Sequence, residues 1–141
     1  MDGTIANLYG YPNWLQKIRK NMTEPYEKCS PMQEYNKIIE LLNKLKQIKE
    51  IEIIVISWTA MGADKNFKKA IKKAKINWLK ENNFPFDKVH IVQYGTKKNT
   101  VRKDLKNAIL FDDDEKVRAT WENSFTEKEI ITTLNKLLTL D

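Results

Sequence analysis

The sequence has a single cysteine and no run of 18 apolar residues, and each shortage argues against a class of protein. Cys29 has no partner for an internal disulfide, which fits a reducing compartment, and we expect this side chain to be buried. No apolar run is long enough to predict a membrane span. The N-terminus lacks a basic segment followed by an apolar one, so no secretory signal is predicted and a cytoplasmic location is expected.

Positive charge is present but unevenly distributed. The net charge is +6, and residues 64–106 hold 13 Lys and Arg against 4 Asp and Glu. A basic face suits anionic partners such as phosphorylated small molecules, nucleic acid or an acidic protein. The alternative is a solvated helix face, because five lysines lie mostly on the outward side of one expected helix: Lys68, Lys69, Lys72, Lys73 and Lys75. No zinc-ligand spacing, Arg-Gly repeat or aromatic RNA-binding strand strengthens the nucleic-acid hypothesis.

The length and composition predict a single domain over residues 1–141. The chain is 41% hydrophobic, which is enough for a core, and no internal repeat or low-complexity linker divides it. Apolar residues recur at three- and four-residue spacing in three segments, which predicts amphipathic helices over 35–48, 66–82 and 126–140. The second of these is expected to bury Phe67, Ala70, Ile71, Ala74 and Trp78. The third begins with a capping-box pattern, Thr126 followed by Glu129.

Short apolar runs lie between the expected helices, at residues 51–56, 89–92 and 108–111. Runs this short and rich in Ile and Val suit strands buried on both faces of a parallel sheet. Together with the helices, they predict an α/β layered fold with a parallel sheet. Ligands of open α/β sheets gather at the carboxyl ends of the strands, so the residues after these ends are the candidate site residues.

The residues that follow the three expected strands are polar. They are Ser57, Trp58 and Thr59, then the segment 94–98, then Asp112, Asp113 and Asp114. Adjacent carboxylates repel one another, and a divalent cation relieves the repulsion; oxygen-only ligands favour Mg²⁺. The alternative is that the three aspartates cap a helix expected over 115–123. The nearby hydroxyl and lysines favour a site that holds a phosphate.

Four motifs in order resemble one protein family. Met1-Asp2-Gly3-Thr4 resembles the end of the Asp-x-Asp-Gly-Thr signature that closes the first strand of haloacid dehalogenase-like (HAD-like) phosphohydrolases. The other three motifs are Ser57, Lys98 with Lys97 as its alternative, and the acidic pair Asp112 and Asp113. The resemblance implies a HAD-like (Rossmann-like) layered sheet with flanking helices, a short cap and Mg²⁺-dependent phosphohydrolase chemistry.

The resemblance also implies a role for each residue. Asp2 is expected to act as the general acid/base, while Gly3 and Thr4 form the substrate-binding turn behind it. Ser57 and Lys98 are expected to hold the phosphate, with Thr59 as a further substrate contact. The remaining role, binding of Mg²⁺ directly or through water, is implied for Asp112 and Asp113.

The family's nucleophilic aspartate would fall one residue before Met1, and the first strand is missing with it. We therefore expect impaired catalysis, since covalent transfer through an aspartate needs that residue. Three explanations stay open. The start is assigned too late, the chain is a fragment completed by a partner strand, or it is a degenerate relative that rearranges or forms a homo-oligomer.

Residues 5–34 correspond to the turn and short cap of the family. Tyr9 and Trp14, with Tyr11 and Tyr26, bring aromatic rings close to the expected phosphate site, a pattern similar to phage and bacterial 5′-nucleotidase-like members. Stacking of Tyr9 and Trp14 on a nucleobase is one interpretation. Packing of a cap helix through Trp14 is the other.

Two functional hypotheses from different classes follow, and they leave open whether the chain is an enzyme. The first is a Mg²⁺-dependent phosphomonoesterase of nucleotidase type, acting on a phosphorylated small molecule and impaired in this chain. The second is a non-catalytic phage or bacterial regulator whose basic face binds an acidic protein or a nucleic-acid complex. Neither hypothesis involves a membrane partner.

Overall fold

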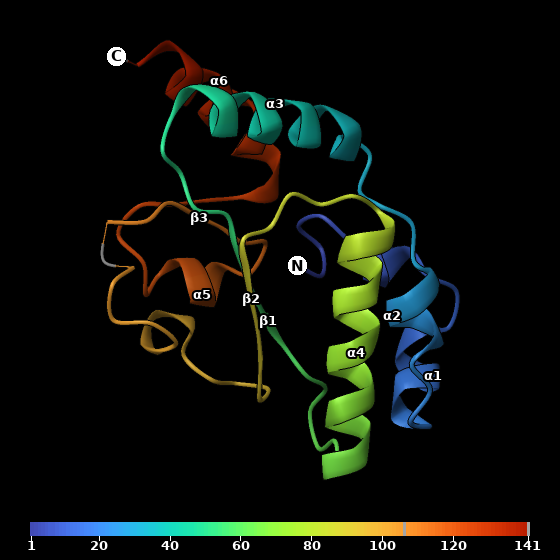
Figure 1. Cartoon of the computed structure of the whole chain (residues 1–141). Helices are drawn as coiled ribbons and strands as arrows, with labels where there is room; N and C mark the ends of the chain where they lie inside the picture. Colours follow the sequence, from blue (N-terminus) through green and yellow to red (C-terminus); the bar gives the residue numbers. More distant parts are fainter. Residues whose placement is uncertain (106, 141) are drawn as a thin grey trace.

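Short parallel strands alternate with helices along the chain, and the computed structural model describes residues 1–105 and 107–140 (Figure 1). The strands are β1 (Ile54–Trp58), β2 (Lys88–Val92), β3 (Leu110–Phe111) and β4 (Ser124–Phe125). The α-helices are α1 (Trp14–Arg19), α2 (Glu24–Lys28), α3 (Tyr35–Ile48), α4 (Lys65–Glu81), α5 (Glu115–Arg118) and α6 (Ile130–Thr139). The 3-10 turns are η1 (Leu8–Gly10), η2 (Lys98–Thr100) and η3 (Glu127–Glu129). The predicted mixed α/β class is confirmed.

The strands form two small parallel sheets where the sequence predicted one layered sheet. β1 pairs with β2, with Ile54 opposite Lys88 and Trp58 opposite Val92. β3 pairs with β4, with Phe111 opposite Phe125. Because paired parallel strands run the same way, the carboxyl ends of β1 and β2 lie at the same edge of their sheet. The polar residues at these two ends are therefore brought close together.

β1 begins later than the predicted strand over 51–56, because Asp87 forms hydrogen bonds with the residue that precedes β1. The N–H of Ile53 donates to Oδ2 of Asp87 at 2.7 Å, and the carbonyl of Ile53 accepts the backbone N–H of Asp87 at 2.7 Å. Regular pairing starts one residue further on, at Ile54. β1 also ends later than predicted, since its pairing with β2 continues through Ser57 and Trp58, which occupy the last two positions of the strand and do not follow it.

Helix α3 has the predicted bounds, and it packs against α6 (Figure 1). Ile38, Leu41 and Leu45 of α3 form one buried cluster with Ile130 and Leu134 of α6. The predicted helix over 126–140 starts as η3 and continues as α6. The capping box between Thr126 and Glu129 is present, which confirms that start signal.

The buried face of α4 differs from the predicted face at three positions, one of which is Leu79, buried although it was not in the predicted set. Phe67, Ile71, Ala74 and Trp78 are buried as expected, whereas Ala70 is exposed. The larger difference is Lys75, which was predicted to point outward but is buried. This helix contacts α2, so one side of α4 is covered by the cap segment (Figure 1).

Residues 1–6 form a tight turn. The carbonyl of Met1 accepts the backbone N–H groups of Thr4, Ile5 and Ala6 at 3.1, 3.0 and 3.2 Å. Gly3 has φ +75°, a left-handed conformation that favours glycine. The turn places Asp2 next to α4 and carries the start of the chain into the buried cluster that contains Val55 and Trp78.

An apolar cavity of about 530 Å³ lies beside β1 and β3. Its walls come from residues 50–56, from the segment around β3, and from α3 and α6. Met1 and Asp112 also line it, so it adjoins the polar cavity described below. Among the helices of the described residues, none combines the length and apolar character that a membrane crossing requires.

The remaining helix predictions fall on less regular segments. The helix expected over 115–123 is short, since α5 ends at Arg118. Its N-cap is Asp114, whose side chain accepts the backbone N–H of Lys116 at 2.8 Å. Cys29 is buried, as expected, and burial raises the pKa of its thiol to about 11.

Candidate functional site

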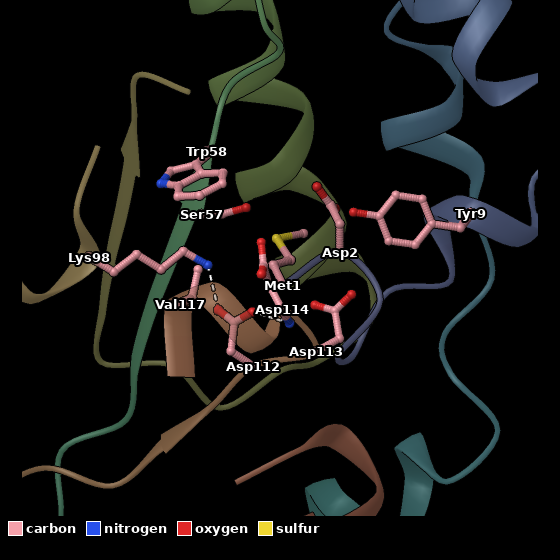
Figure 2. Close-up of a pocket in the computed structure, with 10 residues that line it drawn as sticks. All are labelled: Met1, Asp2, Tyr9, Ser57, Trp58, Lys98, Asp112, Asp113, Asp114 and Val117. Atoms are coloured by element: carbon pink, nitrogen blue, oxygen red, sulfur yellow. Dashed lines mark hydrogen bonds and ion pairs between the residues drawn. The ribbon is translucent and has the colours of Figure 1, made fainter. Parts of the chain in front are cut away.

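Most of the expected site residues line one polar cavity of about 240 Å³ (Figure 2). β1 supplies Ser57 and Trp58, the turn after β2 supplies Lys98, and the residues after β3 supply the aspartates. The lining residues are Met1, Asp2, Tyr9, Ser57, Trp58, Lys98, Asp112, Asp113, Asp114 and Val117. The structure thus brings together four segments that lie far apart in the sequence.

Asp112 and Lys98 form a buried ion pair at the cavity wall. Lys98 Nζ lies 2.6 Å from Asp112 Oδ2, and both side chains are almost fully buried (Figure 2). The other oxygen, Oδ1, accepts the backbone N–H of Asp114 at 2.9 Å. Lys98 Nζ also lies 5.2 Å from the centre of the Trp58 ring, a cation–π distance. The neighbouring Lys97 is exposed, so the structure places Lys98 at the cavity.

Asp113, the second residue of the acidic pair, has no cationic side chain paired with it among the described residues. Burial raises its pKa, and the negative charge of Asp112 raises it further. Its one side-chain hydrogen bond in the described structure comes from Thr4, whose hydroxyl donates to Oδ1 at 3.3 Å. Gly3 approaches Asp113 so closely that a Cβ atom at this position would overlap its carboxylate and the ring of Tyr9. The absence of a side chain at Gly3 therefore sets how closely the N-terminal turn approaches the acidic pair.

Asp2 and Ser57 are linked by a residue that the sequence analysis did not select, Lys75 of α4. Its Nζ lies 2.8 Å from Asp2 Oδ2, 2.8 Å from Ser57 Oγ and 2.6 Å from the carbonyl oxygen of Trp58. A signal for it exists in the sequence. Lys75 stands four residues after Ile71 and three before Trp78, so it shares the apolar stripe of its helix.

The aromatic residues of the cap segment divide between the cavity and the core. Tyr9 lines the cavity, and burial followed by the charge of Asp2 raises the pKa of its phenol. Trp14 packs edge-on against Tyr9, with ring centroids 5.0 Å apart, and onto the cluster that contains Ile18 and Tyr26. Of the two candidate base-stacking residues, only Tyr9 therefore faces the cavity. Trp14 packs against the ring of Tyr9.

Thr59 lies just outside the cavity. Its backbone N–H donates to Val92 at 2.8 Å and extends the pairing of β1 with β2 by one residue. Its buried hydroxyl has no hydrogen-bond partner within residues 1–105 and 107–140. The arrangement makes Thr59 a neighbour of the site residues, not a lining residue.

The amino group of Met1 is a further titratable group at the cavity. Its pKa is lowered from 8.0 to about 6, mainly by burial and next by the positive charge of Lys98. Within residues 1–105 and 107–140, no three Asp, Glu, His or Cys side chains are grouped as a metal site. The pair Asp112 and Asp113 offers two carboxylates, a number that suits Mg²⁺, which commonly keeps several waters and binds one or two carboxylates plus substrate oxygens.

Comparison with known proteins gives no match: no family model, curated protein or solved structure matches the chain.

Proposed function

We propose that the polar cavity binds the phosphate group of a phosphomonoester, as the site of a HAD-like phosphohydrolase relative does. The observation that carries the proposal is the convergence of Ser57, Lys98, Asp2 and the acidic pair on one cavity. Phosphoryl transfer depends mainly on positioning and on charge neutralisation, and these groups supply both. A HAD-like arrangement, with the site at the carboxyl ends of parallel strands, accommodates this set.

Ser57 and Lys98 would hold the phosphate. Ser57 offers a hydroxyl at the end of β1, and Lys98 offers an ammonium group that is held at the wall by Asp112. An ammonium shared between a carboxylate and a phosphate oxygen stabilises negative charge on the phosphate without moving far. Asp2, across the cavity, would exchange a proton with the leaving group.

Mg²⁺ fits the acidic side of the cavity. The pKa of Asp113 is raised first by burial and then by the negative charge of Asp112, and a divalent cation would relieve that repulsion. Asp112 and Asp113 would hold the ion, and Thr4 would keep the Asp113 carboxylate in place. When bound, Mg²⁺ would supply charge neutralisation for the phosphate oxygens.

The substrate class that suits the cavity is a small phosphomonoester such as a nucleoside monophosphate. At about 240 Å³ the cavity is smaller than the roughly 300–1,000 Å³ of typical ligand pockets. It therefore accommodates the phosphoryl end of a substrate, with the remainder outside. Tyr9, at the wall, is placed to contact a sugar or base there.

The test measures phosphate release from a panel of nucleoside monophosphates, with Mg²⁺ and with EDTA, and titrates inorganic phosphate by calorimetry. We expect phosphate binding by the wild-type chain and, where turnover is seen, its loss in EDTA and in Asp112→Asn. Asp104→Asn, an exposed aspartate outside the cavity, is the matched control. A folded wild-type chain that neither binds phosphate nor releases it would contradict the proposal.

A second candidate function uses the basic face of α4. Lys69, Lys72 and Lys73 are exposed, and no ion pair joins them to a carboxylate among the described residues. Such a face favours an acidic protein or nucleic acid as partner. Binding of a short DNA duplex, measured at several salt concentrations, should weaken steeply with salt and disappear when all three lysines are changed to Glu. The Asp112→Asn variant should bind as the wild type does.

A further inference from the structure

The ammonium group of Lys75 has no hydrogen left to donate to a ligand. Its side chain is 1% exposed, and its three hydrogens match three acceptors, on Asp2, Ser57 and Trp58. The Nζ atom also lies 4.9 Å from the centre of the Tyr26 ring, which favours the cation. Lys75 does not line the cavity. Any influence of this lysine on a bound phosphate therefore passes through the residues it contacts.

The contact with Ser57 fixes which way that hydroxyl can donate. Ser57 Oγ accepts a hydrogen bond from Lys75 at 2.8 Å. A hydroxyl that accepts from an ammonium keeps its own hydrogen for a different acceptor. Ser57 lines the cavity, so the oxygen of a phosphate located there is such an acceptor.

The contact with Asp2 fixes one of its carboxylate oxygens. Asp2 Oδ2 is held at 2.8 Å by the same ammonium, while Asp2 itself lines the cavity (Figure 2). One buried cation thus orients two cavity residues from two distant segments, the N-terminal turn and β1. A purely structural ion pair would need only the contact with Asp2.

We propose that Lys75 is a positioning residue that orients the Ser57 hydroxyl to donate to phosphate and holds Asp2 at the cavity. This inference rests on the proposed function, because it assigns Lys75 a role in the same phosphate site. It adds to that site a residue from the buried face of α4, outside the four motifs of the resemblance.

The test is a double-mutant cycle on the binding of inorganic phosphate, measured by calorimetry on the full chain. The variants are Lys75→Met, Ser57→Ala and the double variant, and Lys72→Met on the exposed face of the same helix is the control. We expect Lys75→Met to weaken binding about tenfold, the scale of one charge-assisted hydrogen bond. The double variant should bind no more weakly than Ser57→Ala, since Lys75 acts through Ser57.

The outcomes separate the two proposals. If the folded wild type does not bind phosphate, the proposed function fails and the positioning role fails with it. If the wild type binds phosphate and Lys75→Met binds equally well, only the positioning role is overturned. If the two single effects add in the double variant, Lys75 acts by its charge alone and the orientation of Ser57 by Lys75 is overturned.

A measurement on the wild type covers the case in which Lys75→Met does not fold. The ammonium protons of a buried, hydrogen-bonded lysine exchange slowly enough to be followed by ¹H–¹⁵N NMR. Added phosphate should shift the Lys75 ammonium signal in a saturable way, because Ser57 acquires a new acceptor, and sodium chloride at equal ionic strength should leave it unchanged. An unchanged Lys75 signal at saturating phosphate would overturn the proposal.

Discussion

Lys75 and Lys98 are each buried beside an aspartate of the polar cavity, at 2.8 Å from Asp2 and at 2.6 Å from Asp112. Removing two charges from water is costly, and the mutual attraction offsets this only when further hydrogen bonds satisfy both groups. Here Ser57 and two backbone groups provide those bonds. At the scale of single residues, two buried lysines each hold an aspartate of the polar cavity, although most lysines of the chain lie at the surface.

Gly3 is the position where a single added methyl group should matter most. Gly3→Ala combines a left-handed φ of +75° with overlap of the new Cβ on Asp113 and Tyr9. We expect it to lower the free energy of unfolding by about 1–3 kcal/mol and to weaken phosphate binding. Urea denaturation and calorimetry would measure the two effects.

Gly62→Ala is the matched control for this change. Gly62 has nearly the same φ, +72°, but no atom lies within 4 Å of its added Cβ. Gly62→Ala therefore introduces the backbone strain, but its new Cβ overlaps no neighbouring atom. Equal losses in the two variants would show that the close approach of Gly3 to Asp113 is unimportant.

Asp113 should make the folded chain less stable as the pH rises. Its pKa is raised in the folded chain, so the folded state binds this proton more tightly than the unfolded state does. Stability contributed by the protonated form is therefore lost as the pH rises from the ordinary aspartate pKa of 3.8 through the raised value. At pH 7, Asp113→Asn should melt at a higher temperature than the wild type, and at pH 3.5 the difference should shrink.

Magnesium should act on the same residue. Added Mg²⁺ at pH 7 should raise the melting temperature of the wild type, because the ion relieves the repulsion between Asp112 and Asp113. Asp113→Asn should show a smaller rise. The same rise in both proteins would mean that Asp113 does not hold the ion.

At the scale of elements, the pairing of α3 with α6 is the main helix–helix contact outside the site. Leu45→Ala removes a side chain that is 1% exposed from the cluster shared by the two helices. The expected loss is about 2–5 kcal/mol of unfolding free energy, measured by urea denaturation. Ile48→Ala, near the end of the same helix and 61% exposed, should lose far less. Comparable losses would contradict the packing described here.

The predicted secondary structure agrees with the observed structure where all residues of the predictive pattern lie within one segment. The apolar periodicity of α3 and the capping box at Thr126 both appear in the structure. It was less exact where distant residues intervene. β1 starts at Ile54 because Asp87, far along the chain, occupies the hydrogen-bonding groups of Ile53.

At the scale of the whole molecule, the polar cavity joins four segments that lie far apart in the sequence. A ligand that binds all four should stabilise the folded state against global unfolding. Inorganic phosphate at 100 times its dissociation constant should raise the unfolding free energy by about 2.7 kcal/mol. A thermal melt with phosphate, beside sodium chloride at equal ionic strength, would measure this.

Two neighbouring lysines provide the control for the phosphate effect. Lys98→Met removes the buried ammonium at the cavity and should abolish most of the stabilisation. Lys97→Met removes an exposed neighbour and should leave it unchanged. A phosphate effect that persists in Lys98→Met would place the anion elsewhere on the basic surface.

Local pattern in the sequence was sufficient to predict the α/β class, the bounds of α3 and the capping box at Thr126, because periodicity and capping are local properties. Only the tertiary structure decided that Lys75 is buried, that Tyr9 and not Trp14 faces the cavity, and that Gly3 meets Asp113. Each of these depends on contacts between distant segments. The helical pattern places Lys75 on the apolar stripe of α4, but the acceptors that satisfy its buried ammonium, among them an aspartate 73 residues away, are supplied only by the tertiary structure.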